Sequence, residues 1–306
     1  MNKQELVKEY VKCHKDTEYA LATYLETYDN TQNKHVPFQL FREQTQMVKD
    51  FEDYNENIVL KYRQAGVSTA TSAWISKKLQ FASAEKPEKI LILANKLDTA
   101  TEMANKIKNF LRQWPDWIHV GFDKDKNSQR HYRLTNGSEV KAVATSVDAL
   151  RGYTPTILIF DEAAYIEAGA DLWAACMASL STGQVIVIST PNGFDRIYYE
   201  IYDQSIRGLN EFKISRLKWF NDPRFTKELK WIKIEKDITH YFLNRDEYLD
   251  VEILENVPVD EYSRLESEGY TPYSDWYEQM CKKLKFDRRK ISQELGCAFL
   301  GSGDNV

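Results

Sequence analysis

The sequence is poor in the residues that build metal centres and disulfide frameworks. Its 306 residues include 4 cysteines and 5 histidines. The cysteines are far apart and form no CxxC pair, and the histidines show no HExxH or comparable ligand spacing. This usage argues against a zinc site and against a fold held together by disulfides. The four cysteines are Cys13, Cys176, Cys281 and Cys297.

Long apolar runs and an excess of positive charge are also missing. No run reaches the length needed to cross a bilayer, and the chain starts with a polar helical pattern instead of a signal-peptide core. We therefore expect a cytoplasmic protein without a membrane partner. The formal net charge is -5, so binding to nucleic acid would need a local basic patch or an added domain.

What the sequence does contain is a series of short apolar runs separated by helical patterns. Runs that are apolar on both faces are typical of central strands in a parallel sheet. The alternation predicts an α/β fold with a doubly wound, mainly parallel sheet. The apolar runs cover residues 58–60, 90–93, 157–160 and 185–188. The helical patterns cover residues 42–51, 69–82, 98–114 and 172–180.

One hairpin is predicted within this sheet. Asn136-Gly137 is a strong signal for a tight turn, and the flanking residues 131–134 and 139–143 have the pattern of strands. We interpret this hairpin as an embellishment of the sheet.

Changes of composition along the chain predict three parts. Residues 1–35 carry two helical patterns and form an N-terminal segment. Residues 36–215 contain the apolar runs and form the core. In residues 216–306 the runs stop, and charged and aromatic residues at helical spacing predict a smaller, mainly helical subdomain. The many acidic residues of this last part have no converging spacing, so we interpret them as solvated helix faces.

The segment that follows residues 58–60 has the pattern of a phosphate-binding loop. Such a loop points several backbone N–H groups at one place, at the positive end of the next helix. Gly66 and Ser68 fit the pattern GxxxxGK[ST], but Val67 stands where lysine is expected. The cation must therefore come from Lys61 or Arg63. The predicted loop consists of Lys61, Tyr62, Arg63, Gln64, Ala65, Gly66, Val67, Ser68 and Thr69.

Two acidic residues follow the apolar run at residues 157–160. Asp161 can hold the water shell of Mg²⁺ at the end of a strand, and the hydroxyl of Ser68 can bind the same ion. Glu162 can orient or deprotonate an attacking water. Each motif alone has a plain structural alternative, either a common strand-turn-helix or a strand that enters a polar loop. Together they reinforce each other, because the two strands end at the same sheet edge.

Two further segments are candidates for a role at this edge. Ser189, Thr190 and Asn192 follow residues 185–188, where they could sense hydrolysis beside a γ-phosphate. Arg151 precedes the acidic strand. It could pair structurally, or it could be an arginine finger offered to a neighbouring subunit.

With these motifs in this order, the chain resembles the large terminase subunit of tailed bacteriophages, the motor ATPase that packages DNA into the procapsid. The resemblance covers residues 36–303. It implies a P-loop core of the ASCE type, with an extra strand between the phosphate-loop strand and the acidic strand. It also implies a lid, built from residues 216–303 and packed with residues 1–35.

The resemblance implies ATP and Mg²⁺ as cofactors and a role for each site residue. Gln44, with residues 38–40, would recognise adenine. Lys61 or Arg63 and the loop amides would hold the phosphates, and Glu162 would activate water. The implied Mg²⁺ ligands are Ser68 and Asp161.

The resemblance also implies how hydrolysis is used. Ser189, Thr190 and Asn192 would couple it to movement, and Arg151 in the loop at residues 146–152 would act on an adjacent subunit. The implied partners are double-stranded DNA, the portal protein, the small terminase subunit and further copies of the chain in a ring on the portal. The implied location is the cytoplasm of the infected bacterial host.

Two departures from the family and two rival functions frame these expectations. Val67 replaces the usual lysine, and the chain ends at Val306, where the family normally continues into a nuclease domain. We therefore expect a motor domain without nuclease activity, from a truncated or split gene. The first rival is a helicase or remodeller, which would need a second RecA-like core. The second is an adaptor that binds nucleotide without hydrolysing it.

Overall fold

The computed structural model describes residues 1–29, 33–146, 153–167, 169–179, 183–194, 196–248 and 251–299. The chain divides into two compact units. The first comprises Met1–Leu60, Gly66–Ser189 and Asp195–Ser215. The second comprises Lys61–Ala65, Thr190–Phe194 and Arg216–Val306.

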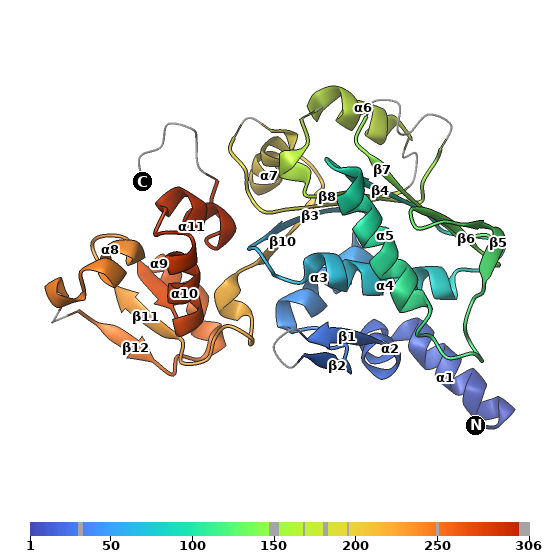
Figure 1. The fold of residues 1–306 in the computed structure, drawn as a ribbon, viewed down its shortest axis with the longest axis horizontal. Helices are drawn as coiled ribbons and strands as arrows, with labels where there is room; N and C mark the ends of the chain where they lie inside the picture. The colour runs from blue at the N-terminus through green and yellow to red at the C-terminus, as the bar shows by residue number, and fades with distance from the viewer. Residues whose placement is uncertain are drawn as a thin grey trace. The chain divides into compact units, whose positions relative to one another are not determined.

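The largest sheet has eight strands in the order β10-β3-β9-β8-β4-β7-β6-β5 (Figure 1). From β3 to β7, neighbouring strands run parallel, as the apolar runs predict. The side chains of Ile58, Ile92, Ile159 and Ile186 in these strands are fully buried. β9 lies between β3 and β8, which confirms the extra strand of an ASCE-type core. The strands are β3 (Glu56–Lys61), β4 (Lys89–Ala94), β5 (Phe122–Asn127), β6 (His131–Leu134), β7 (Glu139–Ala144), β8 (Ile157–Asp161), β9 (Gln184–Ser189) and β10 (Lys213–Leu217).

Helices cover both faces of this sheet, which confirms the doubly wound fold. Figure 1 shows α3, α4 and α5 on one side of the sheet and α6 and α7 on the other. Each predicted helical pattern corresponds to a helix, with ends that differ by a few residues. Within the described residues, no helix combines the length and the apolar character of a membrane span. The helices are α3 (Arg42–Asp53), α4 (Val67–Phe81), α5 (Leu97–Leu111), α6 (Gly169–Ser179) and α7 (Ile197–Ile206).

The predicted hairpin is confirmed, but it is more than an embellishment of the sheet. β6 and β7 pair antiparallel, and β7 also pairs parallel with β4 along its whole length. The turn is attached to α4, because the Asn136 side chain donates hydrogen bonds of 3.0 Å to the carbonyls of Leu79 and Ala82. Gly137 has φ 85°, a conformation that side chains with a Cβ rarely adopt.

The Gly137→Ala substitution should destabilise the first unit by about 1 to 2 kcal/mol, because alanine is strained in the left-handed region. The cost should be backbone strain alone, since the added Cβ would lie 3.5 Å from Pro87, an ordinary contact. Urea unfolding measures the difference. Gly121→Ala is the control, because Gly121 is not among the residues with positive φ, and an equal loss there would contradict the explanation.

The first thirty-five residues belong to the first compact unit, and the packing of this segment with the predicted lid stays a prediction. The Lys77 ammonium of α4 donates a 2.6 Å hydrogen bond to the Thr17 hydroxyl, and the rings of Tyr10 and Phe81 lie 5.1 Å apart. Ala20 and Leu21 of α2 are buried, and α2 packs against α4, so burial of apolar surface attaches this segment to the first unit. The elements are α1 (Lys3–Lys15), α2 (Thr17–Tyr24) and an unpredicted antiparallel hairpin of β1 (Glu26–Asp29) and β2 (Lys34–Pro37).

Among its described residues, the second unit has four α-helices and a three-stranded antiparallel sheet of order β12-β11-β13. The prediction of a mainly helical subdomain missed this sheet. Trp231 lies at its centre, fully buried, with its ring 5.3 Å from Phe220 and 5.0 Å from Tyr262. The elements are α8 (Ile238–Leu243), α9 (Tyr262–Ser267), α10 (Asp275–Lys283), α11 (Arg288–Glu294), β11 (Lys230–Lys233), β12 (Ile253–Glu255) and β13 (Tyr270–Tyr273).

Candidate functional site

The predicted phosphate loop connects the end of β3 to the start of α4. Two of its residues have left-handed backbones: Gln64 has φ 71°, and Gly66, which precedes the first residue of α4, has φ 70° and ψ 9°. The Gly66 carbonyl accepts hydrogen bonds from the N–H groups of Thr69 and Ala70. Left-handed residues among right-handed ones turn successive N–H groups toward one side, which is the backbone geometry that binds phosphate.

The two candidate cations of the loop have different surroundings. Lys61 is buried, with 7% of its surface exposed, at the end of β3. The Arg63 side chain is 65% exposed and lies 3.2 Å from the Glu294 carboxylate. The Arg63 N–H also donates a 2.7 Å hydrogen bond to the Glu294 carbonyl. The last residue of α11 therefore holds Arg63 through both its backbone and its side chain.

The loop is also held by residues that sequence reasoning missed. The Arg224 guanidinium donates a 3.1 Å hydrogen bond to the Gln64 carbonyl, although the two residues are 160 positions apart. Asp222, fully buried, accepts hydrogen bonds from Arg224 and from the Tyr62 hydroxyl. Burial and the nearby Asp222 carboxylate raise the pKa of Tyr62 well above its usual range. The Asp-Pro sequence at residues 222–223 signals only a turn, so no local pattern indicates this contact.

The acidic strand and the phosphate loop meet as predicted. The Ser68 hydroxyl lies 3.4 and 3.3 Å from the two carboxylate oxygens of Asp161, which is 4% exposed. Glu162 has φ 53° and ψ 45° and precedes the short 3₁₀ helix η1 (Ala163–Tyr165). A left-handed backbone at a residue other than glycine costs free energy and is concentrated at functional sites.

A hydroxyl beside a carboxylate fits Mg²⁺ in a nucleotide site. That ion takes one or two protein oxygens and completes its shell with water and phosphate oxygens. Within the described part of the chain, no group of three or more His, Cys, Asp or Glu residues could hold a metal ion. The pair Ser68 and Asp161 therefore suits an ion that arrives with a nucleotide better than a metal bound by protein ligands alone.

Ser189 connects the end of β9 to the residues after Glu162. Its hydroxyl is fully buried and accepts a 3.1 Å hydrogen bond from the Ala164 N–H. The Tyr198 hydroxyl contacts the carbonyls of Ser189 and Val59, at 3.3 and 2.8 Å. These polar contacts thus link the ends of β3, β9 and β8. A shift of any one of the three strands would disturb them. Of the other predicted coupling residues, Thr190 is buried and Asn192 half-buried, both in the second unit.

Gln44 and Arg151 take part in none of the contacts given above. Gln44 is buried in the first turn of α3, where its side chain accepts a 3.4 Å hydrogen bond from the Phe41 N–H. This bond caps the helix. Arg151 lies outside the described residues.

The chain and its fold have known counterparts. A family model described as terminase large subunit, T4likevirus-type, N-terminal, matches residues 58–306. The ATPase domain of the Thermus phage P74-26 large terminase aligns with 18% identity over 86% of this chain and 95% of its own, with a TM-score of 0.55. The large terminase of bacteriophage HK97 aligns with 13% identity over 92% of this chain, with a TM-score of 0.56. That alignment spans 55% of the HK97 protein.

Proposed function

The chain belongs to the family of T4-like terminase large subunits, and we propose that it is the ATP-hydrolysing motor domain of a viral DNA-packaging machine. The observation that carries this proposal is the contact of Ser68 with Asp161, beside a Glu162 held in a left-handed conformation. In this proposal, Ser68 of α4 and Asp161 at the end of β8 are the metal-binding pair, and Glu162, the residue after Asp161, is the base. Positioning of this kind supplies most of the catalysis in phosphoryl transfer.

Each site residue has a distinct task in this proposal. Lys61 or Arg63 and the loop N–H groups bind the phosphates of ATP. Ser68 and Asp161 hold Mg²⁺, which when bound neutralises charge on the phosphate oxygens. Glu162 orients the attacking water and accepts its proton. Gln44 contributes to recognition of adenine.

The coupling residues and Arg151 complete the proposal. Ser189 passes a change at Glu162 to β9 through its hydrogen bond with Ala164, and Thr190 and Asn192 continue that segment. Arg151 acts on the nucleotide of a neighbouring copy in a ring. The ring assembles on a portal protein and works with a small terminase subunit, in the cytoplasm of an infected host cell.

Phosphate release from ATP tests this function. The protein should hydrolyse ATP slowly when dilute and with Mg²⁺ present, and turnover per chain should rise with protein concentration as neighbouring copies supply Arg151. Nucleotide binding without turnover at any concentration would favour the adaptor instead. A helicase would separate the strands of a labelled duplex. That activity would need a second core of parallel strands, and the described residues of the second unit contain none.

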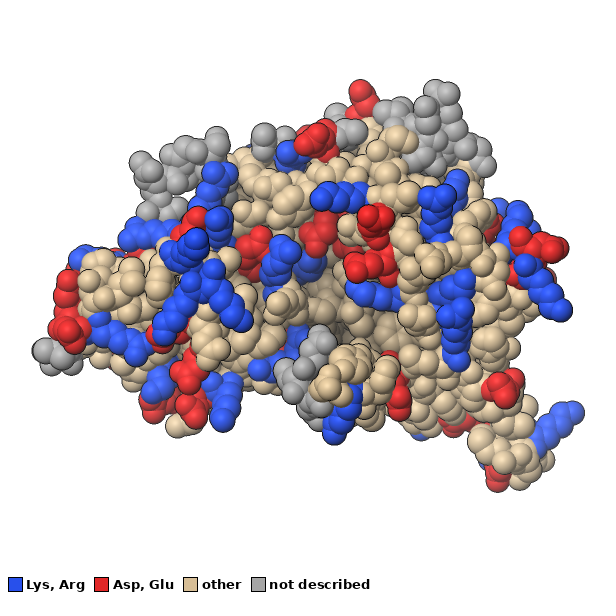
Figure 2. All heavy atoms as spheres, in the orientation of Figure 1, with Lys and Arg blue, Asp and Glu red and all other residues tan. Residues whose placement is uncertain are grey.

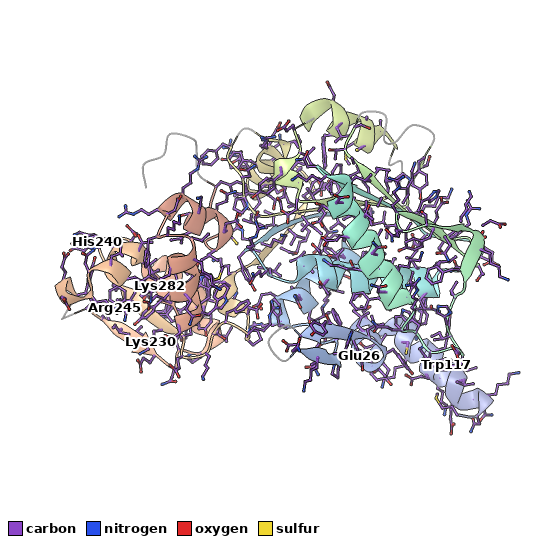
Figure 3. All side chains as sticks on the ribbon, viewed as in Figure 1. Glu26, Trp117, Lys230, His240, Arg245 and Lys282 are labelled. Carbon is purple, nitrogen blue, oxygen red and sulfur yellow. The ribbon has the colours of Figure 1, made fainter. Side chains whose placement is uncertain are left out.

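A basic corner in the second unit supports DNA as the partner. Residues 282–290 span the end of α10, a turn and the start of α11, and basic side chains gather over these helices in Figure 2. Figure 3 labels Lys282 at this place. Lys285 and Phe286 in this turn are both left-handed, with φ 56° and 53°. The corner contains Lys282, Lys283, Lys285, Arg288, Arg289 and Lys290, with Asp287 as its one acidic residue.

Half of these side chains are available to a partner. Lys282, Arg288 and Lys290 form ion pairs. Lys283, Lys285 and Arg289 are exposed and have no ion-pair partner among the residues that the structure describes. An ordinary solvated helix face mixes both signs of charge, whereas this corner concentrates one sign within a single turn. Its charge is complementary to the phosphate backbone of duplex DNA.

Replacing Lys283, Lys285 and Arg289 together by alanine should weaken duplex binding about tenfold or more near 0.1 M salt, and the slope of log affinity against log salt should fall by about three. Fluorescence anisotropy of a labelled duplex measures both quantities. The matched control removes the same charge from α1, at Lys3, Lys8 and Lys15, and should change little. Unaltered duplex binding by the first variant would exclude this surface as the DNA-binding site. If the variant instead lost binding to an acidic protein, the surface would be a protein-binding site.

A further inference from the structure

We propose that Arg224 and Asp222 are positioning residues for nucleotide binding, because together they fix the peptide of Gln64 in the phosphate loop. The inference rests on the proposed function, since it assigns the loop a phosphate ligand. It adds two residues, from a turn far along the chain, that touch no nucleotide and act through the loop backbone.

The Arg224 guanidinium is held in one orientation. Its Nε lies 2.9 and 3.1 Å from the two carboxylate oxygens of Asp222, and one terminal nitrogen lies 2.5 Å from the same carboxylate. Asp222 also accepts a 2.9 Å hydrogen bond from the Arg224 N–H and a 2.5 Å hydrogen bond from the Tyr62 hydroxyl. A fully buried carboxylate needs such partners, so Arg224 has little freedom to turn away. The terminal nitrogen that contacts Asp222 also donates to the Gln64 carbonyl.

Aromatic rings pack against the Arg224 guanidinium and the Tyr62 ring. The guanidinium carbon of Arg224 lies 5.0 Å from the centre of the Phe225 ring, and Trp276 stacks on Phe225 at 4.0 Å. The Tyr62 ring packs edge-on against Trp276 at 6.4 Å. Burial alone would lower the pKa of Arg224, but its hydrogen bonds and attraction to Asp222 outweigh burial and raise that pKa. The group therefore stays charged at every pH at which the protein is folded.

The Gln64 peptide matters because its orientation sets the course of the loop backbone into Gly66 and α4. The Gln64 carbonyl and the Ala65 N–H belong to the same planar peptide and point in opposite directions. Gln64 has φ 71°, a conformation that costs about 1 kcal/mol or more at residues other than glycine. The hydrogen bond from Arg224 compensates for that cost and selects one of the two peptide orientations. The Ala65 N–H donates a 3.4 Å hydrogen bond to the Tyr62 carbonyl, which closes the turn. Without the contact from Arg224, this turn would open part of the time, and the loop N–H groups that follow would be less well aligned with a phosphate.

A purely structural role for the ion pair makes a different prediction. In that case, loss of Arg224 would lower the stability of the second unit and leave the affinity of the folded protein for nucleotide unchanged. Arg245 provides the matched control (Figure 3). Its side chain is 51% exposed, as is that of Arg224, it pairs with the carboxylate of Glu278, and its guanidinium lies 5.5 Å from the Tyr241 ring. In the described part of the chain, no contact of Arg245 involves the phosphate loop.

The experiment is a titration of a fluorescent ATP analogue with Mg²⁺ against the wild type, Arg224→Ala, Arg224→Lys and Arg245→Ala. Arg224→Ala should bind about tenfold or more weakly, as expected when a charged donor is lost. Arg224→Lys, which cannot bridge Asp222 and Gln64 with a planar fork, should recover only part of the affinity. Arg245→Ala should bind like the wild type. The unfolding temperature without nucleotide should fall in both alanine variants, and further in Arg224→Ala, because that variant leaves the buried Asp222 carboxylate without its charged partner.

The outcomes separate this inference from the proposed function. A wild type that binds no nucleotide would overturn the function itself. A wild type that binds, together with an Arg224→Ala variant of equal affinity, would overturn the positioning role alone, as would an equal loss in Arg245→Ala. If Arg224→Ala fails to fold, Tyr62→Phe is the milder variant. It removes one hydrogen-bond donor to Asp222 and leaves Arg224 in place. Its affinity for the ATP analogue should therefore fall by a smaller factor than that of Arg224→Lys. A larger loss in Tyr62→Phe would contradict the assignment of Arg224 as the residue that holds the loop.

Discussion

Glu162→Gln should reduce the rate of ATP hydrolysis by a factor of about 10² to 10⁴, the usual contribution of a positioned general base. Glutamine has almost the same shape, so the left-handed turn at this residue and its neighbour Asp161 should keep their places. The affinity for ATP should therefore change little. Phosphate release measures the rate, and titration with a fluorescent ATP analogue measures the affinity.

The control for this variant is Glu167→Gln, which removes the same charge from an exposed residue shortly after η1. It should hydrolyse ATP at the wild-type rate. If Glu162→Gln kept full activity, Glu162 would not be the base. If it lost affinity in proportion to rate, its role would be binding and not proton transfer, because an interaction made only in the transition state lowers the rate alone.

The central part of the site could be predicted from the sequence because parallel strands impose it. Residues 58–60 and 157–160 are apolar on both faces, which only central strands of a covered sheet require. The carboxyl ends of parallel strands lie at one edge, so Ser68 and Asp161 must approach each other although 93 residues separate them. The tight turn at Asn136-Gly137 was equally readable, because its chemistry is local.

The fold of the second unit could not be predicted in the same way, because it depends on contacts between polar residues that are far apart in the sequence. β11 and β12 have four and three residues, too few for a period of two to stand out from noise. The contacts of Arg224 with Gln64 and of Glu294 with Arg63 join residues that no shared pattern marks. The helical pattern of residues 1–35 likewise did not identify α4 as a partner, because an amphipathic helix shows that it needs a partner and not which partner it has.

These missed contacts change how the phosphate loop is understood. Sequence reasoning treated the loop as a strand-to-helix turn whose glycine sets its shape. In the structure, its residues Arg63 and Gln64 are held by α11 and by the turn at Asp222. The loop has Val67 in place of the usual lysine. Its early residues, Lys61 to Ala65, which include both candidate cations, belong to the second unit. Affinity for nucleotide should therefore respond to substitutions in that unit as well as to those in the loop.

Asp161→Asn should raise the Mg²⁺ concentration for half-maximal hydrolysis by a factor of about 10 to 100, the range seen when metal ligation is impaired. The carboxylate is 4% exposed and lies against the Ser68 hydroxyl, so an amide of the same shape preserves packing and removes the charge that attracts the ion. Hydrolysis measured over a range of Mg²⁺ concentrations separates this effect from a lower maximal rate.

Asp171→Asn, at an exposed position in α6, is the control and should leave the Mg²⁺ requirement unchanged. Ser68→Ala should shift the requirement in the same direction but less, because a neutral hydroxyl binds the ion more weakly than a carboxylate. An Asp161→Asn variant with a normal Mg²⁺ requirement would show that the ion is held elsewhere.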